Sequence, residues 1–81
     1  MIKKPAVIGM GVVGDLVATM LRLYGLEAFG IDKEDIKTVA PIRKGDIQDK
    51  DFLADATTDC DAIICCLPYH LTKDIVEFAY D

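Results

Sequence analysis

The feature that most constrains the fold is a glycine-rich turn between a short apolar run and a segment with helical periodicity. The run Pro5–Ile8 leads into Gly9-Met10-Gly11-Val12-Val13-Gly14, which matches the pattern G-x-G-x-x-G. Apolar residues then recur at helical spacing over residues 12–24. This order of segments predicts a strand, a tight turn and a helix.

A second strand is predicted at residues 26–31, because Gly25 is typical of a helix C-cap and Asp32 ends the apolar stretch. Residues 33–40 are mostly polar and leave room for one short helix. Residues 41–44 predict a brief third strand.

The second half of the chain predicts a helix, a core strand and a final helix. Asp49 is a suitable N-cap for a helix whose inner face holds Phe52, Leu53 and Ala56. Residues 62–67 are apolar without alternation, as in a parallel strand covered on both faces. Pro68 ends that strand, and the last helix is predicted from the spacing of Leu71, Ile75, Phe78 and Ala79.

Strands that alternate with helices and connect through right-handed crossovers favour one architecture. We expect an α/β fold, a Rossmann-like doubly wound parallel sheet with strand order 3-2-1-4, truncated before its second half. With 81 residues, of which 52% are hydrophobic, the chain is expected to form one domain, residues 1–81, without a substrate domain.

Charge and cysteine content exclude several classes of function. The chain carries 9 Lys and Arg against 14 Asp and Glu, and a net charge of −5 disfavours nucleic acid or an anionic membrane as partner. The apolar run near the N-terminus is too short for a signal peptide or a membrane span, so a cytoplasmic protein is expected. Cys60, Cys65 and Cys66 lack metal-ligand spacing and are expected to be reduced, buried thiols, with no metal site.

The glycine pattern has a specific chemical meaning in this context. In a dinucleotide-binding turn, Gly9 allows the tight turn, Gly11 lets the backbone approach a pyrophosphate, and Gly14 lets the helix lie close to the strand. The phosphates then lie at the N-terminus of the helix. A plain tight turn between a strand and a helix is the alternative.

Asp32 favours the dinucleotide interpretation, because it follows Gly14 by 18 residues at the end of the second strand. A carboxylate at that position can bind both ribose hydroxyls of an adenosine. It repels a 2′-phosphate, so NAD is preferred over NADP, although Lys33 partly offsets the repulsion. A solvated acid at the start of a loop is the alternative.

Further candidates lie at the ends of the third and fourth strands. Asp46 is placed to accept a hydrogen bond from an adenine amino group, with Ile47 against the ring, but a turn or capping role explains the segment almost equally well. The main chain of residues 66–69 is expected to line the pyrophosphate and the nicotinamide ribose. His70 is interpreted as a polar residue at a helix start, and no catalytic residue is assigned. The cofactor-binding candidates are Gly9, Met10, Gly11, Val12, Val13, Gly14, Asp32, Lys33, Asp46, Ile47, Cys66, Leu67, Pro68 and Tyr69.

The combination resembles a known family. The glycine turn, Gly45-Asp46-Ile47 before an acidic helix, and above all Cys66-Leu67-Pro68-Tyr69-His70-Leu71 are similar to the NAD(P)-binding amino-terminal domain of the saccharopine dehydrogenase family, which includes lysine 6-dehydrogenase-like enzymes. The resemblance implies an oxidoreductase that acts on a carbon–nitrogen bond of an amino acid or an amino-acid conjugate. Because that family's substrate domain and catalytic groups lie beyond this segment, the chain alone is expected to be inactive.

A second resemblance implies a different class of function. Residues 31–34 and 45–53 are also similar to nucleotide-sensing domains that regulate potassium transport, which bind NAD or another nucleotide without turnover. Those domains usually continue their fourth strand into a small polar residue, so the Leu67-Pro68-Tyr69 sequence favours the dehydrogenase.

The predicted strand order also leaves the strand at residues 62–67 with one neighbour only. A flat, apolar and uncharged edge strand is a template for association. We therefore expect either a homo-oligomer formed through this strand or a missing C-terminal domain that covers it.

Overall fold

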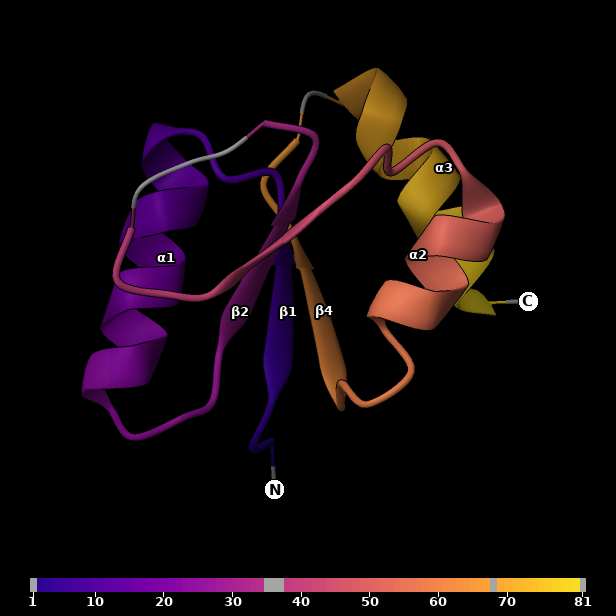
Figure 1. The fold of residues 1–81 in the computed structure, drawn as a ribbon. Coiled ribbons are helices and arrows are strands. Elements are labelled where there is room, and N and C mark those ends of the chain that lie inside the picture. Colours follow the sequence, from indigo (N-terminus) through magenta and orange to yellow (C-terminus); the bar gives the residue numbers. More distant parts are fainter. Residues whose placement is uncertain (1, 35–37, 68, 81) are drawn as a thin grey trace.

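The computed structural model describes residues 2–34, 38–67 and 69–80, which form a single α/β arrangement (Figure 1). Its elements are β1 (Pro5–Ile8), α1 (Val12–Leu23), β2 (Phe29–Asp32), β3 (Ile42–Lys44), α2 (Lys50–Ala56), β4 (Ala62–Cys65) and α3 (Tyr69–Tyr80). The sequence predicted each of these elements, with boundaries that differ by a few residues. The short helix considered for residues 33–40 is not formed by residues 33–34 or 38–40, and residues 35–37 lie outside the described part of the chain.

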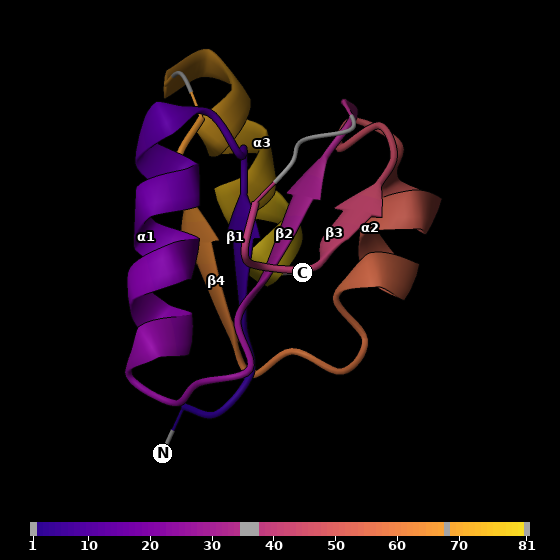
Figure 2. The ribbon, with the colours of Figure 1, turned by 60° about the vertical axis from the view of Figure 1, so that its left-hand side comes forward.

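The four strands form one sheet in the order β3-β2-β1-β4, and every neighbouring pair is parallel. Figures 1 and 2 show α1 on one face of the sheet and both α2 and α3 on the other. The predicted α/β class and the 3-2-1-4 order are therefore confirmed. The carboxyl ends of all four strands lie at the same edge, at the top of Figure 1.

Side chains that alternate along the strands form two apolar clusters, one on each face. The cluster under α2 and α3 contains the larger side chains: Ala6, Ile8, Phe29, Ile31, Leu53, Ala56 and Ile75. The cluster under α1 is smaller and consists of Val7, Met10, Ala18 and Ala40. Because β1 contributes to both clusters, its four residues are fully buried.

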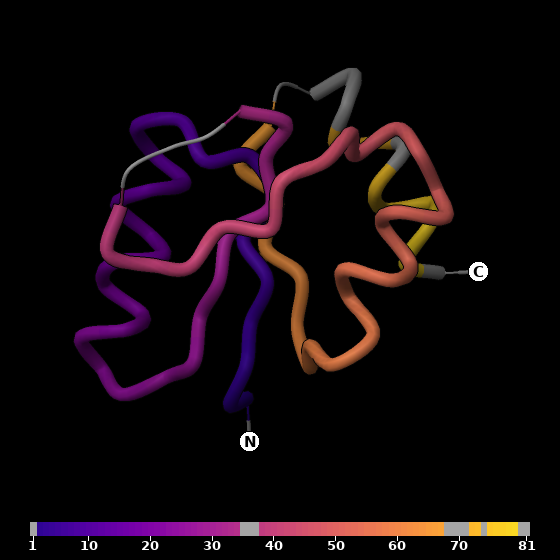
Figure 3. The backbone as a smooth tube through the Cα atoms, in the orientation of Figure 1, coloured from indigo at the N-terminus to yellow at the C-terminus, as the bar shows by residue number. Residues whose placement is uncertain are grey.

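Residues 38–41, the last part of the connection from β2 to β3, lie on the α1 side of the sheet, as the backbone tube in Figure 3 shows. Two contacts hold this connection there: the Thr38 hydroxyl donates a hydrogen bond to the Asp15 carboxylate of α1, and Ala40 is buried in the cluster under the helix. The connection thus takes part in covering that face.

The fourth strand is covered on both faces, as predicted, but only in part: Ile63 and Cys65 pack against one cluster, and Ile64 and Cys66 pack against the other. All four residues of β4 are only partly buried, because the strand lies at the edge of the sheet while α1 packs on β1 and β2. The cysteines are likewise half-buried rather than buried, and all three are free thiols. Burial still raises the pKa of Cys60 and of Cys65, as expected for unreactive thiols.

No helix in the described part of the chain has the length and apolar content needed to cross a membrane.

Candidate functional site

A crevice of about 360 Å³ lies at the carboxyl ends of the strands. Its volume falls at the lower end of the range of about 300–1,000 Å³ that is usual for ligand pockets. Six of the residues singled out in the sequence line it together: Gly9, Asp32, Lys33, Asp46, Ile47 and Leu67. The topology therefore brings the ends of all four strands to one site, which is where parallel α/β sheets bind ligands.

Two of the three motif glycines are required by the fold itself. Gly9 has a positive φ of 91°, and a Cβ there would lie 2.6 Å from Cδ2 of Leu67. A Cβ on Gly14 would lie only 1.9 Å from the carbonyl oxygen of Gly9, because α1 crosses directly over the end of β1. The backbone conformation of the turn and its close packing explain these two residues without a ligand.

Gly11 is different, because nothing in the described structure requires a glycine there. Its φ of −68° is open to any residue, and a Cβ built on it would meet no atom within 4 Å. Gly11 is the N-cap of α1 and makes no side-chain capping bond. The first N–H groups of a helix have no partner within it, so a glycine at this position leaves them open to an approaching anion.

Asp32 is held at the crevice by two backbone hydrogen bonds. Its Oδ2 accepts from the N–H of Met10 at 2.8 Å, and its Oδ1 accepts from the N–H of Glu34 at 3.0 Å. The first bond joins the end of β2 to the glycine turn after β1. A carboxylate has about four acceptor positions, so this fixed group can still accept hydrogen bonds from a ligand.

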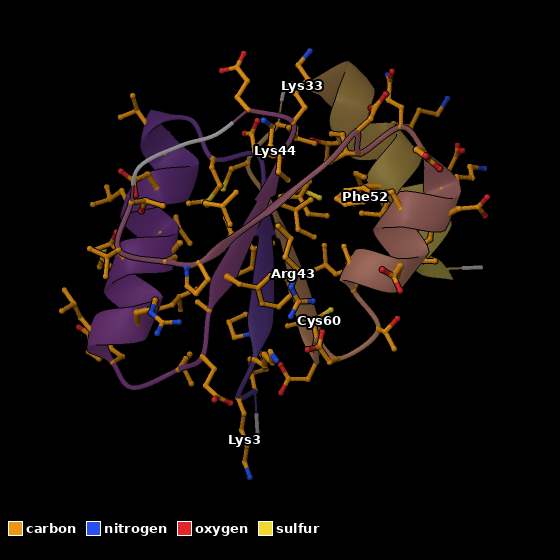
Figure 4. The ribbon with its side chains drawn as sticks, viewed as in Figure 1. Lys3, Lys33, Arg43, Lys44, Phe52 and Cys60 are labelled. Carbon is orange, nitrogen blue, oxygen red and sulfur yellow. The ribbon has the colours of Figure 1, made fainter. Side chains whose placement is uncertain are left out.

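The wall beside Asp32 carries charges of both signs. Lys33 and Glu34 are exposed and line the crevice, and Lys33 is labelled at the top of Figure 4. Asp46 supplies a third carboxylate from the β3 side. With three acids and one lysine, the lining favours a ligand with hydrogen-bond donors over a second phosphate at this end.

The segment after β3 forms a turn and a helix cap. Asp46 Oδ1 accepts from the N–H of Gln48 at 2.9 Å, and Asp49 Oδ1 accepts from the N–H groups of Asp51 and Phe52 at the start of α2. The turn role considered for Asp46 is therefore present. Asp46 is nevertheless exposed to the crevice, and half-buried Ile47 lies beside it.

The remaining candidates lie around the crevice rather than in its lining. The Met10 side chain is buried under the turn, and Val12 and Val13 point outward from α1, with 89% and 63% of their surface exposed. Cys66 lies against the glycine turn, where its N–H donates to the carbonyl of Ile8 at 2.8 Å. Pro68 and the side chain of Tyr69 lie outside the described part of the chain.

Sequence reasoning missed three residues of the lining: Ile31, Glu34 and Gln48. A signal existed for two of them. Glu34 stands beside Lys33 just past a predicted strand end, and Gln48 belongs to the turn that begins at Gly45. Ile31 could not be separated by pattern from the other apolar residues of its strand.

Within the described residues, no group of three or more His, Cys, Asp or Glu side chains comes together to hold a metal ion. No protein-family model matches the chain, and no curated protein matches it.

Proposed function

We propose that the crevice binds the adenosine part of NAD(H), with the pyrophosphate at the N-terminus of α1. In this proposal the chain is a Rossmann-like cofactor-binding domain. Asp32 accepts hydrogen bonds from the ribose hydroxyls, and Gly11 gives the phosphates access to the helix N–H groups.

Gly11 is the observation that carries the proposal. A plain tight turn needs Gly9 for its positive φ and Gly14 for its close contact, but it has no need of a third glycine between them. A ligand group that approaches the main chain of Gly11 as closely as a Cβ would explain why a glycine is present there. The open space at Gly11 lies at the start of α1, where a phosphate is favoured by the helix dipole.

The charges support NAD over NADP. Asp32 and Glu34 stand at the end of β2, where the adenosine ribose would lie, and Asp46 faces the same crevice. A 2′-phosphate there would meet carboxylates, and Lys33 alone would offset them.

The wider activity rests on the resemblance to the saccharopine dehydrogenase family. The nicotinamide of the bound cofactor would accept or donate a hydride at a carbon–nitrogen bond of an amino acid or an amino-acid conjugate. What this chain contributes is the binding and orientation of the cofactor.

The test is calorimetric titration of NAD into the chain and into two variants of Gly11. Gly11→Asp supplies a favourable N-cap and should leave the melting temperature unchanged or raise it, because Asp caps helices well. Its carboxylate would occupy the phosphate position, so NAD affinity should fall at least tenfold. Gly11→Asn adds nearly the same volume without charge, and it separates steric exclusion from repulsion.

Val76→Asp is the matched control, because it adds the same charge at an exposed position of α3 outside the crevice lining. It should bind NAD as the unaltered chain does. Unchanged NAD affinity in both Gly11 variants, or no binding of NAD at millimolar concentration by the unaltered chain, would contradict the proposal.

Turnover of the cofactor is measured separately from its binding. We expect no formation of NADH when the purified chain is mixed with NAD and either lysine or saccharopine, since hydride transfer requires a substrate held against the nicotinamide. NADH formation would assign catalysis to this chain. It would also exclude the alternative of a nucleotide-sensing domain of a potassium transport system, which binds NAD without consuming it.

A further inference from the structure

Helix α1 buries the side that carries its smallest residues. Gly14 and Ala18 face the sheet and are buried, with Val17 and Leu21 partly buried beside them. This close packing follows from the contact between Gly14 and the end of β1. The larger apolar side chains of the helix are therefore not needed to cover the sheet.

Those larger side chains lie on the opposite side of α1. At 3.6 residues per turn, Val12, Leu16, Met20 and Leu23 follow one line along the helix, with Val13 and the C-cap residue Tyr24 beside it. We call these six residues the α1 stripe. They account for six of the nine large hydrophobic side chains that are exposed among the described residues.

The α1 stripe is unusual because the outer side of a surface helix normally carries its polar residues. In α1 the polar residues form a separate line, and their side chains make hydrogen bonds within the chain. Asp15 accepts from Thr38 and Thr19, and Arg22 donates to the carbonyl of Ala28 at 2.9 Å. The stripe carries no charged side chain, and its most exposed members after Val12 are Tyr24 and Leu23, at 80% and 79%.

We propose that the α1 stripe is the contact surface between two copies of this chain, which pack their α1 helices against each other around a two-fold axis. In such an interface the same patch serves on both copies. Antiparallel packing brings Leu16 and Met20 together at the centre, and it brings Val12 of one copy near Leu23 of the other. The small side chains at one end of the stripe thus face the large ones at the other end, and large apolar side chains meet at its centre.

Charge permits contact between two copies at the α1 stripe and disfavours an anionic partner there. Each copy carries a net charge of −5, so two copies repel each other over most of their surfaces. The stripe carries no charged residue, and contact through it brings no like charges together. An anionic partner or a nucleic acid would find no basic group in the stripe.

The available area is also sufficient. Six large side chains that are between 47% and 89% exposed offer on the order of 100 Å² each, which approaches the roughly 800 Å² per partner of a standard interface. The stripe extends toward β4, where Ile64 and Cys66 of the α1-side cluster are only partly buried. Figure 2 shows α2 and α3 on the far face of the sheet from this surface.

The experiment is sedimentation equilibrium of the purified chain and of Leu16→Lys and Leu23→Lys. The unaltered chain should be a dimer at micromolar concentration, and each variant should dissociate at least tenfold more readily. Because each lysine lowers the net negative charge of a copy, weaker association cannot result from greater overall repulsion. Both replaced side chains are exposed, so the melting temperature of the monomer should be retained.

Val76→Lys is the control, because it makes the same kind of change on α3 and should leave the dimer intact. An unaltered chain that stays monomeric at every concentration measured would overturn the proposal. A dimer that survives both stripe variants would also overturn it and would assign association to another surface, such as the edge of β4.

Discussion

Among the described residues, charged side chains form ion pairs at the amino ends of the strands and form none at the carboxyl ends. At the amino ends of the strands, Asp59 pairs with Lys4 at 2.6 Å and with Arg43 at 2.7 Å, and these are the ion pairs that the described residues form. The Arg43 guanidinium also lies 3.9 Å from the centre of the Phe29 ring. At the carboxyl ends, Asp32 is held by backbone N–H groups instead, and Lys33 and Lys44, both labelled in Figure 4, are exposed.

This difference separates stabilisation from recognition within one small domain. At the amino end the ionic groups pair with each other, and Asp61 in addition accepts from the N–H groups of Lys3 and Lys4. At the carboxyl end the acids are fixed in place but have no ionic partner among the described residues. Groups that are positioned yet available for a ligand are what a preorganised binding site requires.

The largest effect is expected on the stability of the fold, at the close backbone contact between Gly14 and Gly9. Gly14→Ala should destabilise the fold by about 3 kcal/mol or more, because its Cβ would lie 1.9 Å from the Gly9 carbonyl oxygen. Gly11→Ala, three residues earlier, should cost no more than about 1 kcal/mol. Urea unfolding of both variants gives the comparison, and equal destabilisation would show that Gly11 also serves the fold.

The second largest effect is expected on cofactor affinity at the carboxyl ends of the strands. Asp32→Asn should lower NAD affinity about tenfold, which corresponds to about 1.4 kcal/mol, because a neutral amide binds two ribose hydroxyls less well than a carboxylate. NADP affinity should fall less, since the repulsion of the 2′-phosphate is removed. Calorimetric titration with both cofactors measures this, with Asp51→Asn as an acid-to-amide control outside the crevice lining. Equal binding of NAD and NADP by both proteins would remove Asp32 from the ribose site.

The corresponding change at the amino end should affect stability alone. Asp59→Asn removes both ion pairs and leaves Arg43 and Lys4 without their carboxylate, so the melting temperature should fall. NAD affinity should stay within about twofold of the original value, because distant sites act independently. Thermal unfolding and NAD titration of the same preparation test the two halves of this statement. A large loss of affinity would mean that the ends are coupled.

The smallest effect is a dependence on pH. Hydrogen bonds from Arg43 and Lys4 hold the pKa of Asp59 well below its usual range, and the N–H of Lys3 lowers the pKa of Asp61. A carboxyl group with a lower pKa in the folded state adds stability above its unfolded pKa of about 3.9, and that stability is lost as the pH falls below this value. Acid unfolding followed by circular dichroism should therefore be less steep in Asp59→Asn. An unchanged acid transition would contradict the assignment.

The order of the strands could be predicted from the sequence, because each strand has a local signature and few topologies join them. The apolar runs, Gly25 after the first helix and Asp49 before the second mark the elements without reference to tertiary contacts. The burial of those elements could not be predicted in the same way. The apolar run of residues 62–67 indicated a strand covered on both faces, but the side chains of β4 are only partly buried, because burial depends on how far the helices reach over the edge of the sheet.

Some features of the candidate site could likewise be predicted from the sequence, and others could not. Strand ends in a parallel sheet meet at one edge, so the meeting of Gly9, Asp32 and Asp46 followed from the topology. The different roles of the motif glycines did not, since Gly11 and Gly14 look alike in a pattern. Only the distance from each glycine to its neighbours separates them.

The pairing of β1 with β4 also has a consequence for how the chain acquires its structure. Pro5 pairs with Ala62, and Ile8 pairs with Cys65, so the central strand is made first and receives one of its neighbours last. During synthesis on a ribosome, β1 can join β2 and then β3 can be added, while the other side of β1 stays unpaired until β4 emerges. Such non-local parallel pairing is slow, because the loop between the partners must close before their contacts form. Until the segment containing Cys65 has left the ribosome, one edge of β1 therefore stays unpaired and the four-stranded sheet is incomplete.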